Sequence, residues 1–411
     1  MMTRSPGLSQ WAETVSIHMP HLSKPVATVL ALWSFGMVMT KSCGLTTVAA
    51  LLADLLQQPE NTVRQRLREW YRDADDKRGA KRQQLDVSGS FSPLINWVLS
   101  YWPSTEKRLA LAMDATTLAQ LFTVLTVSVV YRGCAIPVAW VILPATAKGA
   151  WKAHWLDLFK HLQGSIAADW TVIVLADRGL YAPWLYQQIV RLGWHPYLRI
   201  NANGKFRLHG AAEWRLLAEL APHVGSAWCG QVICFKTHSL ACTLLTCWQA
   251  AYADPWLIIT DLTPEQADVC WYSLRTWIEC GFKDTKRGGW QWQQTRITDP
   301  ERASRLWLAI AVATLWVVSV GGEADATLPA SSLEELPETH IARRRTTRRS
   351  RPRLLSCFRR GSLLILTSMI LGTPRLGGRF YPEPWPSALI GDTSGLFAQP
   401  LPAPALQETY P

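Results

Sequence analysis

Two carboxylates directly follow apolar runs that have the pattern of buried strands, a position typical of catalytic or metal-binding acids. Asp114 follows LALAM and Asp177 follows WTVIVLA. An acid in such a place is costly to bury unless it is hydrogen-bonded, paired with a cation or bound to a metal. A capping or structural role would be favoured for one such acid alone. Two of them in a basic chain favour a metal site.

A third acid falls on a helix that we predict from Thr263 to about Lys286. The predicted start, Thr263-Pro264-Glu265-Gln266, has the form of a capping box with proline at the first helical position. At 100° per residue, one stripe about 60° wide collects an aromatic hydroxyl, two cations and one carboxylate. These are Tyr272, Arg275, Lys286 and Glu279.

The stripe has two interpretations. Arg and Lys flanking Glu279 would hold phosphates beside a metal ligand. The same residues would also form ordinary surface salt bridges at helical spacing, and Lys283 falls on the stripe as well. The three acids together are more specific than any one of them. Their hard oxygen ligands suit Mg²⁺ or Mn²⁺, and two such ions can activate water or a 3′-hydroxyl in phosphoryl transfer.

The first hundred residues have a helical pattern and include a candidate DNA-reading pair. Residues 45–58 carry apolar residues at helical spacing, and an Arg-rich helix follows over 61–72. Arg64 and Arg68 lie on its polar side, away from Val63, Leu67 and Trp70. A helix, a short turn and an Arg-rich helix suit DNA binding, and an ordinary surface helix explains the pattern equally well. Residues 73–93 are polar and are predicted to be a linker.

From residue 108 onward the pattern changes to a mixed α/β sheet. Three strands in a meander are followed by helix, strand, helix and strand, and a β-rich insertion is predicted over 203–262. The predicted ranges are 109–113, 121–131 and 135–143 for the meander, then 148–163, 170–176, 183–192 and 196–200, with a further apolar helix over 300–320. The expected domains are a helical region 1–100, an α/β region 106–320 and a C-terminal region 321–411.

Composition narrows the function classes. The chain has 411 residues, of which 48% are hydrophobic, so a large core is possible and wholesale disorder is excluded. The formal net charge of +11 suits a polyanionic partner such as nucleic acid, or simply a basic surface. Nine cysteines without a C-x-x-C motif indicate a reduced, cytoplasmic chain, and four of them in the insertion make only a weak zinc pattern.

Neither a signal peptide nor a membrane span is expected. The longest apolar runs fall short of the roughly 18 residues that a spanning helix needs and are predicted to be buried helices. Residues 341–360 carry nine arginines, a composition that supports contact with phosphates. The last forty residues are rich in Pro and Gly and are expected to be poorly ordered.

The motif resembles a known family. Tyr272-x2-Arg275-x3-Glu279-x6-Lys286 has the spacing of the Y-R-E-K signature of IS4-type DDE transposases, over a region of roughly 106–320. Asp114 and Asp177 resemble the first two acids of the DDE triad. The chain departs from the best-studied relatives after the signature Arg, where they carry Trp and this sequence has Thr276.

The resemblance implies an RNase H-like fold and a DNA transposase of an insertion sequence. Asp114, Asp177 and Glu279 would be catalytic and would bind two Mg²⁺, with Mn²⁺ as a substitute. Tyr272 and Arg275 would grip phosphates together with Lys286. The partners would be double-stranded DNA, as transposon ends and target, and a second copy of the chain. A bacterial cytoplasmic location at the nucleoid is implied, with no membrane partner.

Two other interpretations remain at the level of sequence. An inactive relative would occupy the element ends without cutting them, using the basic helix and the Arg-rich segment. A different RNase H-like nuclease would use the same acids on RNA or structured DNA. The presence of all three acids favours the enzyme, and the Y-R-E-K spacing favours transposition over simple hydrolysis.

Overall fold

A computed structural model describes residues 6–77, 83–147, 149, 151–250, 252–327 and 355–387. The chain forms two compact units. Unit 1 comprises residues 1–170, 277–331 and 353–383, and unit 2 comprises residues 171–276, 332–352 and 384–411. The division into domains predicted from the sequence stays a prediction.

Unit 1 begins with helices that pack through aromatic and aliphatic side chains. They are α1 (Pro6–His18), α2 (Lys24–Thr40), α3 (Leu45–Leu56), α4 (Glu60–Tyr71) and α5 (Phe91–Ser100). The α3–α4 pair predicted from the sequence is confirmed, and Val63, Leu67 and Trp70 form the buried side of α4. Short 3₁₀ turns, η1 (Ala74–Asp76) and η2 (Ser88–Ser90), replace part of the predicted linker.

Three antiparallel strands form the sheet of unit 1. They are β1 (Arg108–Leu118), β2 (Phe122–Tyr131) and β3 (Cys134–Pro144), and they pair in the order β3-β2-β1. Arg132 and Gly133 make the tight β2–β3 turn with positive φ angles of 44° and 78°. Every residue of β2 is buried, because helices α5, α6 (Lys152–Leu162) and α8 (Trp277–Thr285) pack on this sheet.

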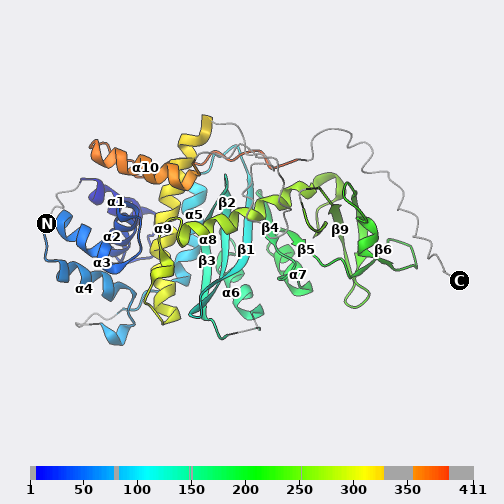
Figure 1. Cartoon of the computed structure of the whole chain (residues 1–411), viewed down its shortest axis with the longest axis horizontal. Helices are drawn as coiled ribbons and strands as arrows, with labels where there is room; N and C mark the ends of the chain where they lie inside the picture. The colour runs from blue at the N-terminus through cyan, green and yellow to red at the C-terminus, as the bar shows by residue number, and fades with distance from the viewer. Residues whose placement is uncertain are drawn as a thin grey trace. The chain divides into compact units, whose positions relative to one another are not determined.

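Helix α9 (Pro300–Ala324) is the core of unit 1 and contacts both the N-terminal helices and β3 (Figure 1). The predicted helix over 300–320 is therefore confirmed, with four more residues. Among the described helices, α9 has by itself the length and hydropathy of a membrane span. Its apolar window is completely buried inside the unit, which is the environment of a core helix.

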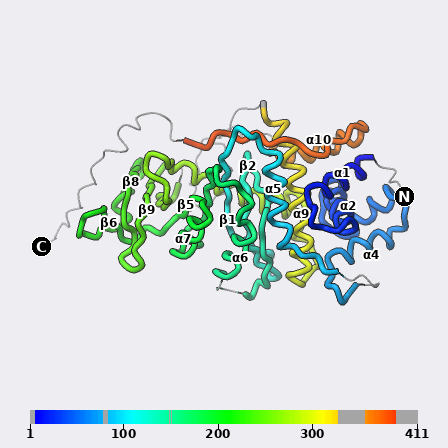
Figure 2. Tube along the Cα trace, turned by 180° about the vertical axis from the view of Figure 1, so that it is seen from behind, coloured from blue at the N-terminus to red at the C-terminus, as the bar shows by residue number. Residues whose placement is uncertain are grey.

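A last helix, α10 (Cys357–Ile370), lies against α9, and the segment after it continues along unit 1 (Figure 2). Trp316 of α9 donates its indole N–H to the carbonyl of Arg375 at 2.9 Å, and the amide of Phe380 donates to Tyr101 at 2.9 Å. The expectation of poor order is therefore wrong for residues 372–387. The rest of that tail, 388–411, and most of the Arg-rich stretch, 341–354, lie outside the described residues.

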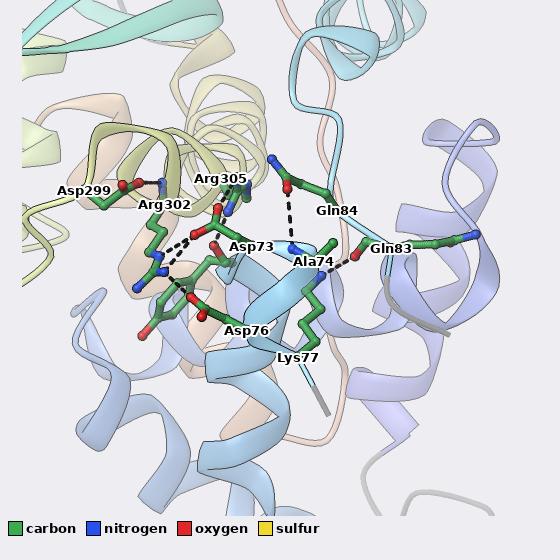
Figure 3. A network of polar contacts seen from close by, with 10 residues as sticks. Asp73, Ala74, Asp76, Lys77, Gln83, Gln84, Asp299, Arg302 and Arg305 are labelled. Atoms are coloured by element: carbon green, nitrogen blue, oxygen red, sulfur yellow. Dashed lines mark hydrogen bonds and ion pairs between the residues drawn. The ribbon is translucent and has the colours of Figure 1, made fainter. Parts of the chain in front are cut away.

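An ion-pair cluster fixes the end of α4 to α9 (Figure 3). Asp73 accepts hydrogen bonds from Arg302 at 2.7 and 3.0 Å and pairs with Arg305 at 2.8 Å. Arg302 also pairs with Asp76. The Arg305 side chain is only 1% exposed and donates to the Tyr71 carbonyl at 2.7 Å. Residues 73–76, predicted to be a free linker, are thus an attachment point.

We expect Asp73→Asn to lower the free energy of unfolding at neutral pH by about 2 kcal/mol, between the values of exposed and buried ion pairs. The hydrogen bond from Arg302 holds the pKa of Asp73 below its usual value. Its stabilisation is therefore complete above the unfolded pKa, near 4, and is lost as the pH falls through the lower folded pKa. Urea unfolding at several pH values measures this.

The matched control is Asp76→Asn, because Asp76 pairs with the same arginine but its side chain is 48% exposed. We expect its effect to stay below about 1 kcal/mol. Equal losses in the two variants would contradict the assignment of Asp73 as the principal attachment.

Unit 2 is a mixed sheet with one parallel pair. Strand β4 (Thr171–Ala176) runs parallel to β5 (His195–Arg199), and helix α7 (Pro183–Arg191) connects them and packs on β5. Antiparallel strands continue the sheet in the order β5-β10-β9-β8-β6-β7. They are β6 (Lys205–Leu208), β7 (Arg215–Leu216), β8 (Ala227–Cys234), β9 (Leu240–Cys247) and β10 (Trp256–Thr260), with the 3₁₀ turn η3 (Leu217–Leu220) after β7.

The β-rich character predicted for residues 203–262 is confirmed, and its last strand joins the sheet beside β5. Both units combine sheet and helix, so the predicted mixed α/β class is also confirmed. An antiparallel meander followed by β4, α7 and β5 is consistent with an RNase H-like core. The nine cysteines are free thiols, and the described residues contain no cluster of three His, Cys, Asp or Glu side chains that could hold a metal ion.

Candidate active site

Asp114 lies within strand β1, opposite Thr126 of β2. The preceding residues 109–113 are buried, and Asp114 is the first half-buried position after them. The sequence predicted that the strand ends here, which is wrong, since β1 continues to Leu118. What ends at Asp114 is the run of consecutive buried residues. Its Oδ1 accepts the backbone N–H of Ala115 at 2.8 Å, which helps to orient the carboxylate.

Glu279 lies in the first turn of α8, where the positive end of the helix dipole favours a carboxylate. The helix approaches the sheet closely because residue 281 is glycine. A Cβ there would lie 2.7 Å from the Cβ of Ala135 in β3, closer than side-chain atoms tolerate. Glu279 itself is half-buried. Asp114 and Glu279 therefore come from two packed elements of the same unit.

Lys286 follows the last residue of α8 and reaches strand β1. Its Nζ donates to Thr116 Oγ1 and to the Thr117 carbonyl, both at 2.9 Å. Partial burial lowers the pKa of this amine. Lys286 thus ties the end of α8 to the strand that carries Asp114, two and three residues beyond that acid. A phosphate contact for Lys286 stays a prediction.

In unit 2, Asp177 follows β4 directly, as the sequence predicted. Its Oδ1 accepts the backbone N–H of Arg178 at 2.6 Å. Its other oxygen, Oδ2, lies 3.7 Å from an Arg275 guanidinium nitrogen. The Asp177 side chain is 39% exposed, whereas Arg275 is 4% exposed. Arg275 therefore offers a fixed positive charge beside an accessible carboxylate.

The continuous helix predicted from Thr263 to Lys286 is wrong. A 3₁₀ turn, η4 (Pro264–Gln266), is followed by extended backbone at Ala267, where φ is −113° and ψ is 142°. A 3₁₀ helix, η5 (Val269–Thr276), then precedes α8. Asp268 accepts the amide of Cys270 at 2.8 Å, a local bond that competes with α-helical pairing.

The stripe calculated for a single α-helix consequently does not exist. Tyr272 and Arg275 still share a face, because residues three apart superimpose in a 3₁₀ helix. Tyr272 is 2% exposed, and its ring packs edge-on against Trp256 at 5.2 Å. Trp256 is 4% exposed and belongs to the core of unit 2.

The predicted triad is divided between the two units. Asp114, Glu279 and Lys286 belong to unit 1, whereas Asp177, Tyr272 and Arg275 belong to unit 2. Within unit 2 the structure brings Asp177 and Arg275 together, and within unit 1 it joins Lys286 to the strand of Asp114. Their catalytic and phosphate-binding roles stay predictions.

Arg64 and Arg68 lie on α4 and are both half-buried. Arg64 lines a cavity of about 520 Å³ together with the start of α3, which includes Thr46 and Thr47. The two helices therefore exist as predicted, and their contact with DNA stays a prediction.

Asp284, an acid at the end of α8, was not among the site residues predicted from the sequence. Burial raises the pKa of Asp284 to about 7, although Arg359 and Lys283 favour its charged form. It lines a cavity of about 860 Å³ whose other charged residues are all cations. The single acid in the run KDTKRGG was a signal for this site. No sequence signal indicated that Arg359 lines the same cavity, because α10 is distant in the sequence.

The structure is a mixed α/β fold whose predicted acids lie in strand β1, directly after strand β4 and in the first turn of α8. The family model of the transposase DDE domain matches residues 107–316, just over half of the chain. The chain therefore belongs to the family of DDE transposases. The match includes all three predicted acids. No curated protein matches the chain.

Proposed function

We propose that this transposase is of the IS4 type, binds the terminal inverted repeats of an insertion sequence, and cuts and joins DNA at their ends. The observation that carries the proposal is the retention of Asp114, Asp177 and Glu279 inside the matched DDE domain. None of the three is fully buried, so each is accessible to a ligand. Their Y-R-E-K context supports the IS4 type.

We propose that the three carboxylates would bind two Mg²⁺ ions, with Mn²⁺ as a substitute. All the donors are hard oxygens, which these ions prefer. The ions, when bound, would lower the pKa of the attacking water or 3′-hydroxyl and stabilise the leaving oxygen. The backbone amides of Ala115 and Arg178 hold the first two acids in a fixed orientation.

Basic residues near the acids would bind and orient the DNA. Arg275, fixed beside Asp177 at 3.7 Å, would offer its guanidinium to a phosphate, as arginine forks commonly do. Lys286, anchored to β1, would place its charge close to the strand of Asp114. Tyr272 shares a face of the 3₁₀ helix with Arg275, and its ring is buried. Tyr272 would therefore support Arg275 from the buried side.

The remaining partners follow from the same proposal. Helix α4, through Arg64 and Arg68, would contribute to recognition of the element ends. Two copies of the chain would assemble on the two ends, in the bacterial cytoplasm at the nucleoid. The net charge of +11 supports binding to double-stranded DNA as ends and as target.

An inactive relative that only binds element ends is the second candidate. The half-buried arginines of α4 are as compatible with this candidate as with the enzyme, because DNA binding through them does not depend on cleavage. The two candidates differ in whether a divalent ion yields a product.

The test is a cleavage assay with end-labelled DNA that carries the flanking inverted repeats. We expect a nick, hairpin or joined product with Mg²⁺ and none with EDTA. Asp177→Asn removes one ligand charge and should eliminate the product, whereas Asp157→Asn on the exposed side of α6 should leave it unchanged. Binding without a product in Mg²⁺ and in Mn²⁺ would favour the inactive relative.

A further inference from the structure

Two neighbouring cavities of unit 1 form a surface rich in cations. The first, of about 860 Å³, is lined by Lys283, Lys286, Arg287 and Arg359. The second, of about 330 Å³, shares Arg287 and Arg359 and adds Lys41. Because they share Arg287, Gly288 and Arg359, the cavities adjoin. We call these five cations and the two cavities the basic groove.

The charges of the basic groove are poorly compensated. Lys41, Lys283, Arg287 and Arg359 are exposed, and none of them forms a salt bridge with another described residue. The single acid in the lining is Asp284. A surface with this excess of positive charge attracts a polyanion.

At the centre of the groove, the backbone of Gly289 closely approaches Asp284 and Phe358. A Cβ on Gly289 would lie 2.4 Å from the carbonyl oxygen of Asp284 and 2.5 Å from the ring of Phe358. Trp290 also packs edge-on against Phe358 at 5.0 Å. Helix α10 is therefore held directly over the end of α8.

The two adjacent arginines of α10 have different surroundings. Arg360 pairs with Asp325, which is completely buried and also accepts from the Cys357 thiol at 2.9 Å. Arg359 is exposed and lines both cavities of the groove. The structure thus uses Arg360 to fix the helix and leaves Arg359 available to a ligand.

We propose that the basic groove binds the sugar–phosphate backbone of double-stranded DNA, independently of base sequence. The proposal rests on the proposed function and adds a surface that involves Lys41 and Arg359, both outside the matched DDE domain. Cations spread over two adjoining cavities suit a chain of phosphates better than one small anion. Lysine and arginine contacts of this kind position DNA without reading its bases.

The test is equilibrium binding of fluorescent duplexes in EDTA, so that cleavage does not contribute. One duplex has random sequence and the other carries the element end. Arg359→Ala, Arg287→Ala and Lys41→Ala should each weaken binding about three- to tenfold on both duplexes and reduce the salt slope by about one. Lys160→Ala, which removes an exposed charge from α6, is the matched control and should leave both quantities unchanged.

A variant of opposite sign makes the test more specific. Asp284→Asn removes the one acid of the lining. It should strengthen binding to both duplexes about threefold or more at pH 8.5, where the carboxylate is charged, and by less at pH 6. Exposed cations contribute little to folding, so the melting temperatures of the alanine variants should match that of the unmodified protein.

The possible results separate the groove from the proposed function. Unchanged salt slopes in all three alanine variants, with normal binding by the unmodified protein, would overturn the groove and leave the transposase intact. Loss of affinity for the element end alone would also overturn it, because it would show base-specific recognition. Competition by millimolar inorganic phosphate that disappears in Arg359→Ala would identify a small-anion site and likewise overturn it. Normal groove effects without Mg²⁺-dependent cleavage would support the groove and contradict the enzyme.

Discussion

Glu279→Gln is expected to reduce Mg²⁺-dependent cleavage of element-end DNA by about a thousandfold or more, as loss of an essential catalytic group does. The substitution keeps the shape of the side chain and removes its negative charge. A divalent ion requires that negative charge in this ligand. Glu279 lies in the first turn of α8, fixed by the contact of Gly281 with β3. The helix should therefore remain in place, and the measurement is cleavage under single-turnover conditions.

Binding of the same DNA in EDTA should change less than about threefold, because no metal bridges the carboxylate and the phosphate there. The matched control is Glu301→Gln, which makes the same change in the first turn of α9 at an exposed position. Cleavage within twofold of the unmodified enzyme would contradict the role of Glu279. A parallel loss in the control would show that the effect is electrostatic and general.

Gly361→Ala is expected to destabilise unit 1 by about 3 kcal/mol, at the upper end of what overpacking costs. A Cβ at Gly361 would lie 1.8 Å from the Val317 carbonyl oxygen, and one at Gly321 would lie 1.8 Å from the Cys357 carbonyl oxygen. Helices α9 and α10 therefore touch backbone to backbone, and neither backbone can yield without separating the helices. In an isolated helix the same change would increase stability by about 1 kcal/mol. The sign of the change in stability therefore shows whether the two helices are in close contact.

Denaturant unfolding measures this prediction. Thr367→Ala on the exposed side of α10 is the control and should change stability by no more than about 0.5 kcal/mol. A second readout is DNA binding: displacement of α10 would withdraw Arg359 from the basic groove and lower the salt slope. A neutral or stabilising effect of Gly361→Ala would refute the close contact of the two helices.

Local pattern was sufficient for most individual elements. The strands β2, β3, β4 and β5 fall within two residues of their predicted ranges, because alternating or continuous apolar runs bounded by turn residues are read directly from sequence. Helices α4 and α9 were also anticipated. The family match confirms the DDE transposase domain inferred from three acids and a spaced motif.

Local pattern failed where competing local bonds or long-range contacts decide. The spacing of Tyr272, Arg275 and Glu279 fits an α-helix as well as a 3₁₀ helix followed by an α-helix, and the Asp268 side-chain bond favours the second. The continuation of β1 beyond Asp114 depends on pairing with β2, including Leu118 opposite Phe122. Neither effect can be detected from the periodicity of apolar residues in the sequence.

The sequence by itself determined the chemistry of this protein: the three carboxylates, the cations spaced around Glu279, the positive net charge and the mixed α/β class. These are properties of residue type and local order. The tertiary structure decided which residues meet: Lys286 with β1, Arg275 with Asp177, the α4 end with α9, and Arg359 with the end of α8. Such contacts join residues far apart in the chain, and they depend on how buried surfaces pack together.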